Sequence, residues 1–357
     1  MEPWSCGAGC GVGAVFCYIC KDMQKARLLF IGTGTSQGVP IIGCHCGVCT
    51  SKDPRDKRFR SSVLVDFAGL RILVDAGPDF RSQMLRADVS HLDAILFTHN
   101  HRDHTGGLDD VRSLNYVDKS AAEVYCEQRV LDSLKLQYAY AFAEKLYPGA
   151  PILHIHLIDE KPFIIDARTE HHDLTWIHDK GYCYVMPDGS LLPTGGGSIM
   201  APEEGVSLEK ALAWQTGDGI GAGIVGEADL RKALGERRAA IIPIRGLHDQ
   251  MPVLGFRFGN IAYITDMSRL PDSEYEKLQG LDHVTLNTVG YKPHHSHFSL
   301  YEALDVADKI GARHTWLTHL SHTFPTYDEF AGQLHKLCEE RGVRSDVMPA
   351  YDGLVIE

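Results

Sequence analysis

Short apolar runs, each ending in glycine or in polar residues, recur from residue 27 onward and predict a series of strands. RLLFIGTG (27–34) and AILFTH (94–99) are two such runs. Between them, SSVLVDF (61–67) and RILVDAG (71–77) flank a tight Ala-Gly turn, which predicts a β-hairpin. The first part of the chain is therefore expected to form a sheet.

Helical spacing follows these strands. Apolar residues recur at helical intervals through GLDDVRSLNYV (107–117) and AAEVYCEQRVLDSLKLQYAYAF (121–142), and PFII (162–165) begins another strand. The last part of the chain predicts strands at 240–248, 252–259, 261–266 and 314–322 and helices at 299–311 and 327–342. This order of strands and helices, with His and Asp at the strand tips, predicts a layered α/β sandwich with a site at the strand ends.

The segment from about 166 to 239 breaks this rhythm and is expected to be an insertion. It contains the loop PDGSLLPTGGGS (187–198) and two stretches with helical spacing, 207–214 and 227–240. Because the insertion directly precedes the strand that leads to His248, one hypothesis makes it a lid or pocket wall that sets substrate choice. The alternative is a peripheral or dimer-forming decoration, which leaves a homodimer open.

The first 22 residues differ from the rest and are expected to form a poorly ordered extension before a natural start at Met23. They lack the positive charge and the small-residue cleavage site of a signal peptide. A second zinc knuckle built on Cys17 and Cys20 is the alternative. Residues 23–357 are then expected to form one domain that carries the insertion.

Composition narrows the function classes. The 357 residues are 44% hydrophobic, which is enough for a large core. Lys and Arg number 35 against 47 Asp and Glu, and this formal charge of −12 argues against a general nucleic-acid binder, because counterion release needs a basic surface. There is no run of 18 apolar residues, so we expect no membrane-spanning helix. The acidic balance is typical of a cytoplasmic protein.

The cysteines are bunched rather than scattered. Cys44, Cys46 and Cys49 form a C-x-C-x2-C cluster in GCHCGVCT (43–50). Disulfide frameworks belong to small secreted chains, so metal-bound thiolates are the better interpretation. A closed structural zinc site needs four ligands, which leaves this loop one ligand short.

The stretch THNHRDHTGG (98–107) carries the strongest chemical signal. His99, His101, Asp103 and His104 directly follow a buried strand, and imidazole and carboxylate are ligands for zinc, manganese or iron. Four ligands in six residues exceed what one ion needs from a single loop, so the motif predicts a pair of metals.

Three further residues have the chemistry and the placement to complete such a pair. His248 in RGLHDQ, Asp266 in ITDM and His319 in LTHL each follow an apolar strand. Any one of them alone would more often be a polar cap than a ligand. Together with the preceding motif they predict a site where strand tips converge.

The chain resembles the metallo-β-lactamase superfamily, whose H-x-H-x-D-H motif stands here as HNHRDH (99–104). The resemblance covers about residues 27–357 except the insertion, and it implies an αββα sandwich in which residues 23–357 form a hydrolase domain. It also implies two divalent catalytic metals, which are Zn, Mn or Fe. Asp75 in LVDAG matches an early Asp of the superfamily that orders a loop rather than binding metal.

The resemblance assigns the ligands as follows: His99, His101 and His248 to one metal, Asp103, His104 and His319 to the second, and Asp266 as the bridge. Two ions roughly 3.5–4 Å apart can share a hydroxide and clamp an anionic substrate, so the expected reaction is hydrolysis. Asp103 and His297 in KPHHSHFS are the expected catalytic residues, with His297 as general acid beside His294 and His295.

Within the superfamily, the chain is most similar to the phosphoribosyl cyclic-phosphate diesterases of phosphonate degradation. The shared features are FIGTG, Gln37-Gly-Val-Pro, the CHCGVC loop, His297 and a further His, here His322. His319 and His322 bracket a strand tip, so one can face the catalytic metals while the other turns toward the cysteine loop. Cys44, Cys46, Cys49 and His322 would then form a Cys3His structural zinc site, with His45 as the rival fourth ligand.

Other functions remain open beside hydrolysis of a small linear or cyclic phosphodiester. A lactonase or thioesterase would use the same dinuclear centre. A tRNA 3′-processing endonuclease would share the motif but lacks this cysteine loop, and the insertion here is not strongly basic. A metal-binding scaffold without catalysis is the non-enzyme alternative. Arg102, Arg245 and Lys292 are candidate phosphate contacts.

Overall fold

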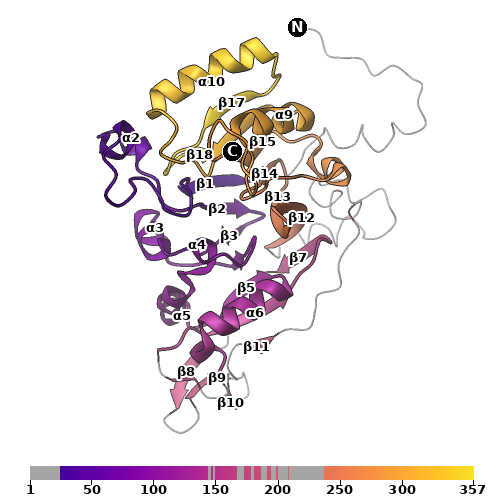
Figure 1. Ribbon diagram of the computed structural model, residues 1–357. Coiled ribbons are helices and arrows are strands. Elements are labelled where there is room, and N and C mark those ends of the chain that lie inside the picture. The colour runs from indigo at the N-terminus through magenta and orange to yellow at the C-terminus, as the bar shows by residue number, and fades with distance from the viewer. Residues whose placement is uncertain are drawn as a thin grey trace, which may run out of the picture.

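The computed structural model places two large sheets face to face, with helices on both outer sides (Figure 1). It describes residues 25–143, 146–147, 149–166, 173–177, 181–185, 191–193, 198–199, 208 and 237–357. The expected N-terminal extension and most of the two stretches expected to be helical within the insertion lie outside these residues.

The first sheet has eight strands among the described residues. Their order is β11 (Ser198–Ile199), β6 (Leu153–Leu157), β5 (Ala122–Cys126), β4 (Ala94–Leu96), β3 (Leu70–Val74), β2 (Ser62–Phe67), β1 (Arg27–Gly32) and β18 (Val355–Ile356). The strands β2 and β3 form the predicted hairpin, pairing Phe67 with Leu70 across Ala68 and Gly69. From β3 to β11 all pairings are parallel, so the carboxyl ends of β3, β4 and β5 share one edge.

The second sheet has seven strands in the described part of the chain. Their order is β17 (Asp346–Pro349), β16 (His314–Thr318), β15 (His283–Asn287), β14 (Ile261–Tyr263), β13 (Met251–Phe258), β12 (Arg238–His248) and β7 (Phe163–Asp166). The pairings from β14 to β17 are parallel, and those from β7 to β14 are antiparallel. A small antiparallel sheet within the insertion contains β8 (Asp173–Ile177), β9 (Gly181–Val185) and β10 (Leu191–Pro193).

Successive side chains along a strand point to opposite faces of its sheet, so one face packs between the two sheets and the other packs against the outer helices. In β3, Ile72 and Val74 pack between the sheets with Phe256 and Tyr263 from the second sheet, whereas Leu73 points outward. The outward side of the first sheet is covered by α3 (Phe80–Arg86), η2 (Leu108–Val111), α5 (Arg112–Asp118), α6 (Gln128–Gln137) and η3 (Ala139–Ala141). The outer face of the second sheet is covered by η4 (Asp272–Leu278), α9 (Leu300–Ile310) and α10 (Tyr327–Arg341). The predicted αββα sandwich is confirmed.

Local signals explain why the two late helices were predicted well. A capping box of Ser299 and Glu302 opens α9, and another of Thr326 and Glu329 opens α10. The helices end at Gly311 and Gly342, which have φ of 71° and 66°. This left-handed conformation suits glycine because it has no Cβ.

Other predicted elements were wrong. Residues 121–142 are not one helical stretch, because Ala122–Cys126 pair with β4 and β6 as β5 before α6 begins. The strand β6 was not predicted, since its LHIHL pattern places His on one face and apolar side chains on the other. The last residues of the expected helix 227–240 are not helical, because β12 begins at Arg238. The expected loop 187–198 contains the strand β10.

None of the helices in the described part of the chain has the length and apolar character needed to span a bilayer.

Candidate metal centre

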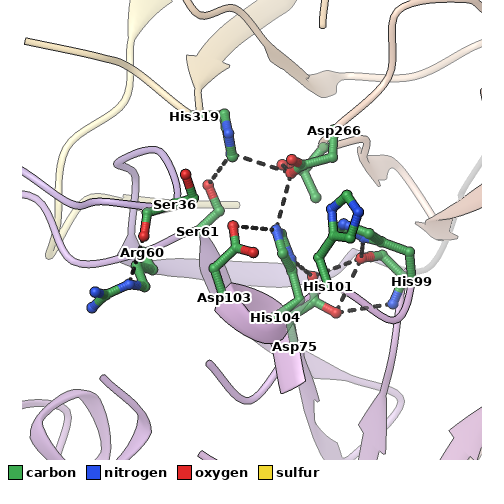
Figure 2. Close-up of polar contacts among 12 residues, drawn as sticks. Ser36, Arg60, Ser61, Asp75, His99, His101, Asp103, His104, Asp266 and His319 are labelled. Carbon is green, nitrogen blue, oxygen red and sulfur yellow. Dashed lines mark hydrogen bonds and ion pairs between the residues drawn. The ribbon is translucent and has the colours of Figure 1, made fainter. Parts of the chain in front are cut away.

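Strand ends from both sheets bring the predicted ligands to one place. His99 follows β4, and His101, Asp103 and His104 lie on and before the short helix α4 (Arg102–Thr105). The opposite sheet contributes three residues at or just past the ends of β12, β14 and β16, namely His248, Asp266 and His319. Figure 2 shows Asp103, His104, Asp266 and His319 pointing toward one another, with His99 and His101 beside them.

The backbone is strained at three points of this site. Asp75, Asp266 and His319 have φ of 66°, 56° and 56°, a left-handed conformation that is uncommon for residues other than glycine. Such conformations cost of order 1–3 kcal/mol each, and they concentrate at functional sites. Asp75 and His319 come directly after β3 and β16, and Asp266 comes three residues after the end of β14.

Asp103, His104, Asp266 and His319 form one donor set. Asp266 Oδ2 lies 3.2 Å from His104 Nε2 and 3.2 Å from His319 Nδ1, and Asp103 Oδ2 lies 3.4 Å from His104 Nε2. Ligand atoms held at about 2.1 Å by one tetrahedral ion lie about 3.4 Å apart. The spacing of these atoms therefore fits a shared divalent ion.

The second donor set contains His99, His101 and His248. The His101 ring lies 4.7 Å from that of His99 and 4.9 Å from that of His248. His99 Nε2 is buried and has no hydrogen-bond partner among the described residues, while its Nδ1 lies 2.9 Å from Thr98 Oγ1. A buried imidazole nitrogen without a partner is costly unless an ion occupies its lone pair, so His99 also fits a metal.

The carboxylate of Asp266 lies close to residues of both sets. Its oxygens group with nitrogens of His99 and His104, and also with nitrogens of His248 and His297, with the atoms of each group within 4.8 Å of one another. Thr265 Oγ1 donates to Asp266 Oδ2 at 2.7 Å and fixes its rotamer. The placement is that of a bridging ligand, although ligation by any of these residues stays a prediction.

Behind the ligands, Asp75 and Thr98 form a buried support. Asp75 accepts from Thr98 N at 2.9 Å and Thr98 Oγ1 at 2.8 Å, and its Oδ2 lies 2.7 Å from His104 Nδ1. Such outer contacts select the tautomer of a metal-binding imidazole and orient its ring. The structure thus agrees with a loop-ordering Asp75 that faces away from the metal position.

Burial and neighbouring charges shift the titration of the ligands. Burial, together with the charge of His104, lowers the pKa of His99 well below the ordinary value. Burial also opposes a charge on His104, but Asp266, Asp75 and Asp103 outweigh it and raise the pKa of His104. Burial disfavours a charged Asp266 as well, yet His319 and His104 lower its pKa well below the usual range.

His297 lies over both donor sets. Its ring is 4.6 Å from that of His248 and 4.7 Å from that of His319, and its Nδ1 lies 3.7 Å from Asp266 Oδ1. Burial and the charge of His319 lower the pKa of His297 to about 3, so the imidazole is neutral at pH 7 in this arrangement. The position fits the predicted acid, and it also permits ligation together with His248 and Asp266.

The candidate phosphate contacts differ in their availability. Arg245 on β12 pairs with Glu127 at 2.6 Å and with Glu160 at 3.4 Å, so its guanidinium is already engaged. Arg102 is exposed and donates to Gln137 Oε1 at 3.0 Å. Lys292 is exposed and has no ion pair with any described residue. Lys292 is therefore the most available of the three cations.

The cysteine loop and His322 meet as predicted. His322 Nδ1 lies 3.2 Å from Cys44 Sγ and 3.6 Å from both Cys46 Sγ and Cys49 Sγ. A tetrahedral zinc with Zn–S of about 2.3 Å and Zn–N of about 2.0–2.1 Å would place these atoms about 3.6 Å apart. His45 is exposed and lies outside the group. The geometry fits a closed zinc site, and zinc itself stays a prediction.

This cluster ties two parts of the chain together. The cysteines lie on and before α2 (Gly47–Thr50), followed by η1 (Pro54–Asp56), whereas His322 follows β16. Leu320 N donates to Thr33 O at 2.8 Å, and this hydrogen bond links the turn from His319 to His322 to the segment that follows β1. The cluster therefore braces the turn that positions His319.

Two supporting residues were missed at the level of sequence. Thr98 contacts His99, and Ser61 Oγ lies 3.1 Å from His319 Nδ1 while donating to Gly34 O at 2.9 Å. The place of Thr98 between a strand and His99 is a signal that could have identified it. Nothing near Ser61 in the sequence points to a histidine more than 250 residues away.

Comparison with known proteins identifies the family. A family model described as the beta-lactamase superfamily domain matches residues 70–177 and 226–320. The chain belongs to this superfamily. Its membership confirms the metallo-β-lactamase fold.

Relatives refine the position within the superfamily. A crystal structure of a new diphosphatase from the PhnP family is 29% identical, with a TM-score of 0.64, and the match covers 93% of this chain and 98% of that chain. The chain thus lies near the PhnP branch of the superfamily, and the predicted branch is confirmed. Zinc-bound PqqB from Methylobacterium extorquens is 14% identical over 93% of this chain and 99% of that chain, with a TM-score of 0.53, and shows the shared fold alone.

One relative is about twice as long as the matched region, and its name gives an acyl-transfer activity. An octanoyltransferase of Porphyromonas gingivalis is 34% identical over 85% of this chain but only 47% of its own length. The chain spans about half the length of the curated relatives it matches.

Proposed function

We propose that this protein is a dinuclear metal-dependent phosphodiesterase acting on a small linear or cyclic phosphodiester. The observation that carries the proposal is the position of Asp266, whose carboxylate lies 3.2 Å from His104 Nε2 and from His319 Nδ1 and groups within 4.8 Å with nitrogens of His99 and of His248. The diphosphatase of the PhnP family supports phosphoryl chemistry, since it matches nearly the whole of both chains.

The residues present fit two divalent ions. His99, His101 and His248 would hold one, Asp103, His104 and His319 the other, with Asp266 between them. Two such ions lower the pKa of a bound water toward about 7 and neutralise charge on phosphoryl oxygens. Imidazole and carboxylate donors suit Zn, Mn or Fe, and the buried His99 Nε2 fits this use.

His297 is the proposed acid for the leaving oxygen. It is partly buried beside His248, His319 and Asp266, so its ring can reach a substrate held over both donor sets. A phosphodiester anion next to this imidazole favours the protonated form, which opposes the lowering of the His297 pKa by burial. The proton then passes from His297 to the leaving oxygen.

Cys44, Cys46, Cys49 and His322 are the proposed ligands of a structural zinc. A Cys3His set closes the coordination of the ion, which leaves no open position for substrate. The role of this zinc is to hold the turn that contains His319. We therefore expect three metal ions per chain, of which the thiolate-bound zinc should be the hardest to remove.

Acyl-ester hydrolysis is the second candidate. It is favoured by the Porphyromonas gingivalis relative, although the octanoyltransferase activity in its name can belong to the half of that protein that this chain does not match. We place nucleic-acid cleavage lower, because the net charge of −12 opposes binding of a polyanion.

One experiment separates these functions. The purified protein is loaded with Zn or Mn, its metals are counted, and hydrolysis of bis-p-nitrophenyl phosphate, p-nitrophenyl octanoate and a tRNA precursor is measured. The proposal expects metal-dependent hydrolysis of the phosphodiester that disappears in Asp266→Asn. Full metal loading with turnover of the octanoyl ester alone would overturn the proposal in favour of acyl chemistry.

A further inference from the structure

Two segments that carry residues of the proposed site leave neighbouring strands side by side. The loop 288–299 follows β15 and carries His297, and the turn 319–323 follows β16. The two strands are parallel partners, and just past their paired ends the backbone N–H of residue 288 donates to Thr318 O at 2.9 Å. The loop and the turn therefore start in contact, and each can influence the position of the other.

Hydrogen bonds close the His297 loop (288–299) at its base. Val289 N donates to Phe298 O at 3.3 Å. Leu300 N donates to Gly290 O at 2.8 Å. Phe298 directly follows His297, and the side chains of Phe298 and Leu300 are buried on the outer face of the second sheet. A displacement of Val289 is therefore passed to the backbone next to His297.

The hydroxyl of Ser321 holds this base from the neighbouring turn. Ser321 Oγ donates to Val289 O at 2.6 Å. Thr323 Oγ1 lies 2.6 Å from Ser321 Oγ and 3.4 Å from Val289 O. Because the single hydroxyl proton of Ser321 goes to the carbonyl, Thr323 donates to Ser321. Two hydroxyls of the turn thus converge on one carbonyl of the His297 loop.

The turn itself is anchored on both sides of Ser321. On one side, Leu320 N donates to Thr33 O at 2.8 Å. On the other side, His322 Nδ1 lies 3.2 Å from Cys44 Sγ within the cysteine cluster. The backbone of Ser321 is therefore held in place from both directions, and its hydroxyl gives the His297 loop a fixed point of attachment.

We propose that Ser321 is a positioning residue for His297, the proposed acid. The hydroxyl of Ser321 holds Val289, Val289 holds Phe298, and the ring of His297 keeps its place over the two donor sets. This inference rests on the proposed phosphodiesterase function. Ser321 exchanges no atom with the substrate. The cysteine cluster then supports proton donation as well as stability, because it fixes the turn from which Ser321 acts.

Two diesters that differ in the leaving group test this role. Methyl phenyl phosphate releases a phenol that needs the proton of the acid, whereas methyl p-nitrophenyl phosphate releases a less basic phenolate that needs it less. With the metal-loaded protein, Ser321→Ala should lower kcat for the phenyl diester about 10–100-fold and for the p-nitrophenyl diester less than about threefold. KM should change less than about twofold for both, because Ser321 does not touch the substrate.

Two further variants serve as controls. Ser321→Thr keeps the hydroxyl and should restore most of the kcat for the phenyl diester. Ser273→Ala removes the hydroxyl of an exposed serine on η4 and should change neither substrate. An equal loss for both diesters in Ser321→Ala, or a loss of metal ions, would overturn the proposal, because Ser321 would then support the ligands of its own turn rather than the acid.

A double-mutant cycle separates positioning from direct action. In the His297→Ala background, Ser321→Ala should lower kcat for the phenyl diester less than about twofold, because no acid is left to position. Full additivity of the two losses would overturn the proposal.

Hydrogen exchange tests the contact without turnover. Phe298 N donates to Met267 O at 2.8 Å, and Leu300 N donates to Gly290 O, so both amides report on the base of the loop. In Ser321→Ala the peptide 289–300 should exchange about fivefold faster or more, and in Ser273→Ala it should be unchanged. If the unmodified protein hydrolyses neither diester, the proposed function fails, and exchange then decides whether Ser321 positions the His297 loop. Unchanged exchange in Ser321→Ala would overturn the proposal.

Discussion

Asp266 Oδ2 lies 3.2 Å from Nε2 of His104, although the two residues come from opposite sheets of the sandwich. Both side chains are almost completely buried, at 2% and 1% exposure. The strand ends of the two sheets thus meet at two buried polar side chains. Burying such groups costs free energy unless they pair with each other or with an ion.

The substitution Asp266→Asn tests whether the Asp266 carboxylate is shared by the two proposed metal positions. The amide is isosteric but neutral, so it should weaken both proposed metal positions. Outer-shell changes typically reduce metal affinity or activity by about 10–100-fold, and loss of a shared ligand should exceed about 100-fold. Metal analysis should find the structural zinc retained and the other ions reduced. Full metal content with unchanged phosphodiester turnover would exclude a bridging role.

Thr98→Val should weaken the metal held by His99. Thr98 Oγ1 lies 2.9 Å from His99 Nδ1, and valine keeps the shape without the hydroxyl. We expect about 10–100-fold weaker metal binding at one of the two positions, measured by competition with a chelator. Thr98→Ser is the matched control, because it retains the hydroxyl. Equal affinities in both variants would show that this contact does not orient His99.

His297→Ala distinguishes an acid from a ligand. As the acid, His297 should contribute about 10²–10⁴-fold to turnover, with the metals retained. The loss should be greatest for substrates with poor leaving groups, since these need the proton most. Loss of a metal ion along with activity would instead assign His297 to the ligands with His248 and Asp266.

The cysteine site makes a prediction for stability. His322→Ala should release one zinc and lower the Tm by about 5 °C or more, because a metal that binds only the folded chain stabilises it. His45→Ala is the matched control, since His45 is exposed within the same loop. A Tm that falls equally in both variants would contradict the assignment of His322.

A pH dependence of stability should arise far from the metals. Hydrogen bonds of His91 with Asp118 and Asp93 raise the pKa of His91 to about 9. The folded pKa is raised, so the stabilisation is fully present below about pH 6.5 and is lost as pH rises through about 9. The His91 side chain is 38% exposed, and the expected contribution is therefore only about 1 kcal/mol.

The urea midpoint at pH 6 and at pH 9.5 measures this contribution. His91→Gln should remove about 1 kcal/mol at pH 6 and have a smaller effect at pH 9.5. An equal effect of the substitution at both values would mean that the charge of His91 does not stabilise the fold.

The positions of the candidate ligands could be predicted because the strands before them have an apolar character that is evident in the sequence. His99 follows AILFT and His319 follows HTWLT, and parallel strands bring such ends to a common edge. The residues that orient the candidate ligands, such as Ser61, could not be predicted in the same way. The contact of Ser61 with His319 depends on the packing of two sheets, and neither residue has a local pattern that indicates the other.

Errors in the elements have a similar origin. In β5, AEVYC has apolar spacing that continues into α6, so pairing with neighbouring strands decides its conformation rather than its own pattern. In β6, His154 and His156 share a face with Glu123 between them, at 3.1 and 2.6 Å. Because these buried positions are polar, the hydrophobicity pattern does not predict the strand.

Anomalous diffraction from crystals of the zinc-loaded protein tests the central claim most directly. The account predicts two peaks about 3.5–4 Å apart on either side of the Asp266 carboxylate, and a third among Cys44, Cys46, Cys49 and His322. A single peak, or none, next to Asp266 in fully loaded crystals would contradict the dinuclear centre.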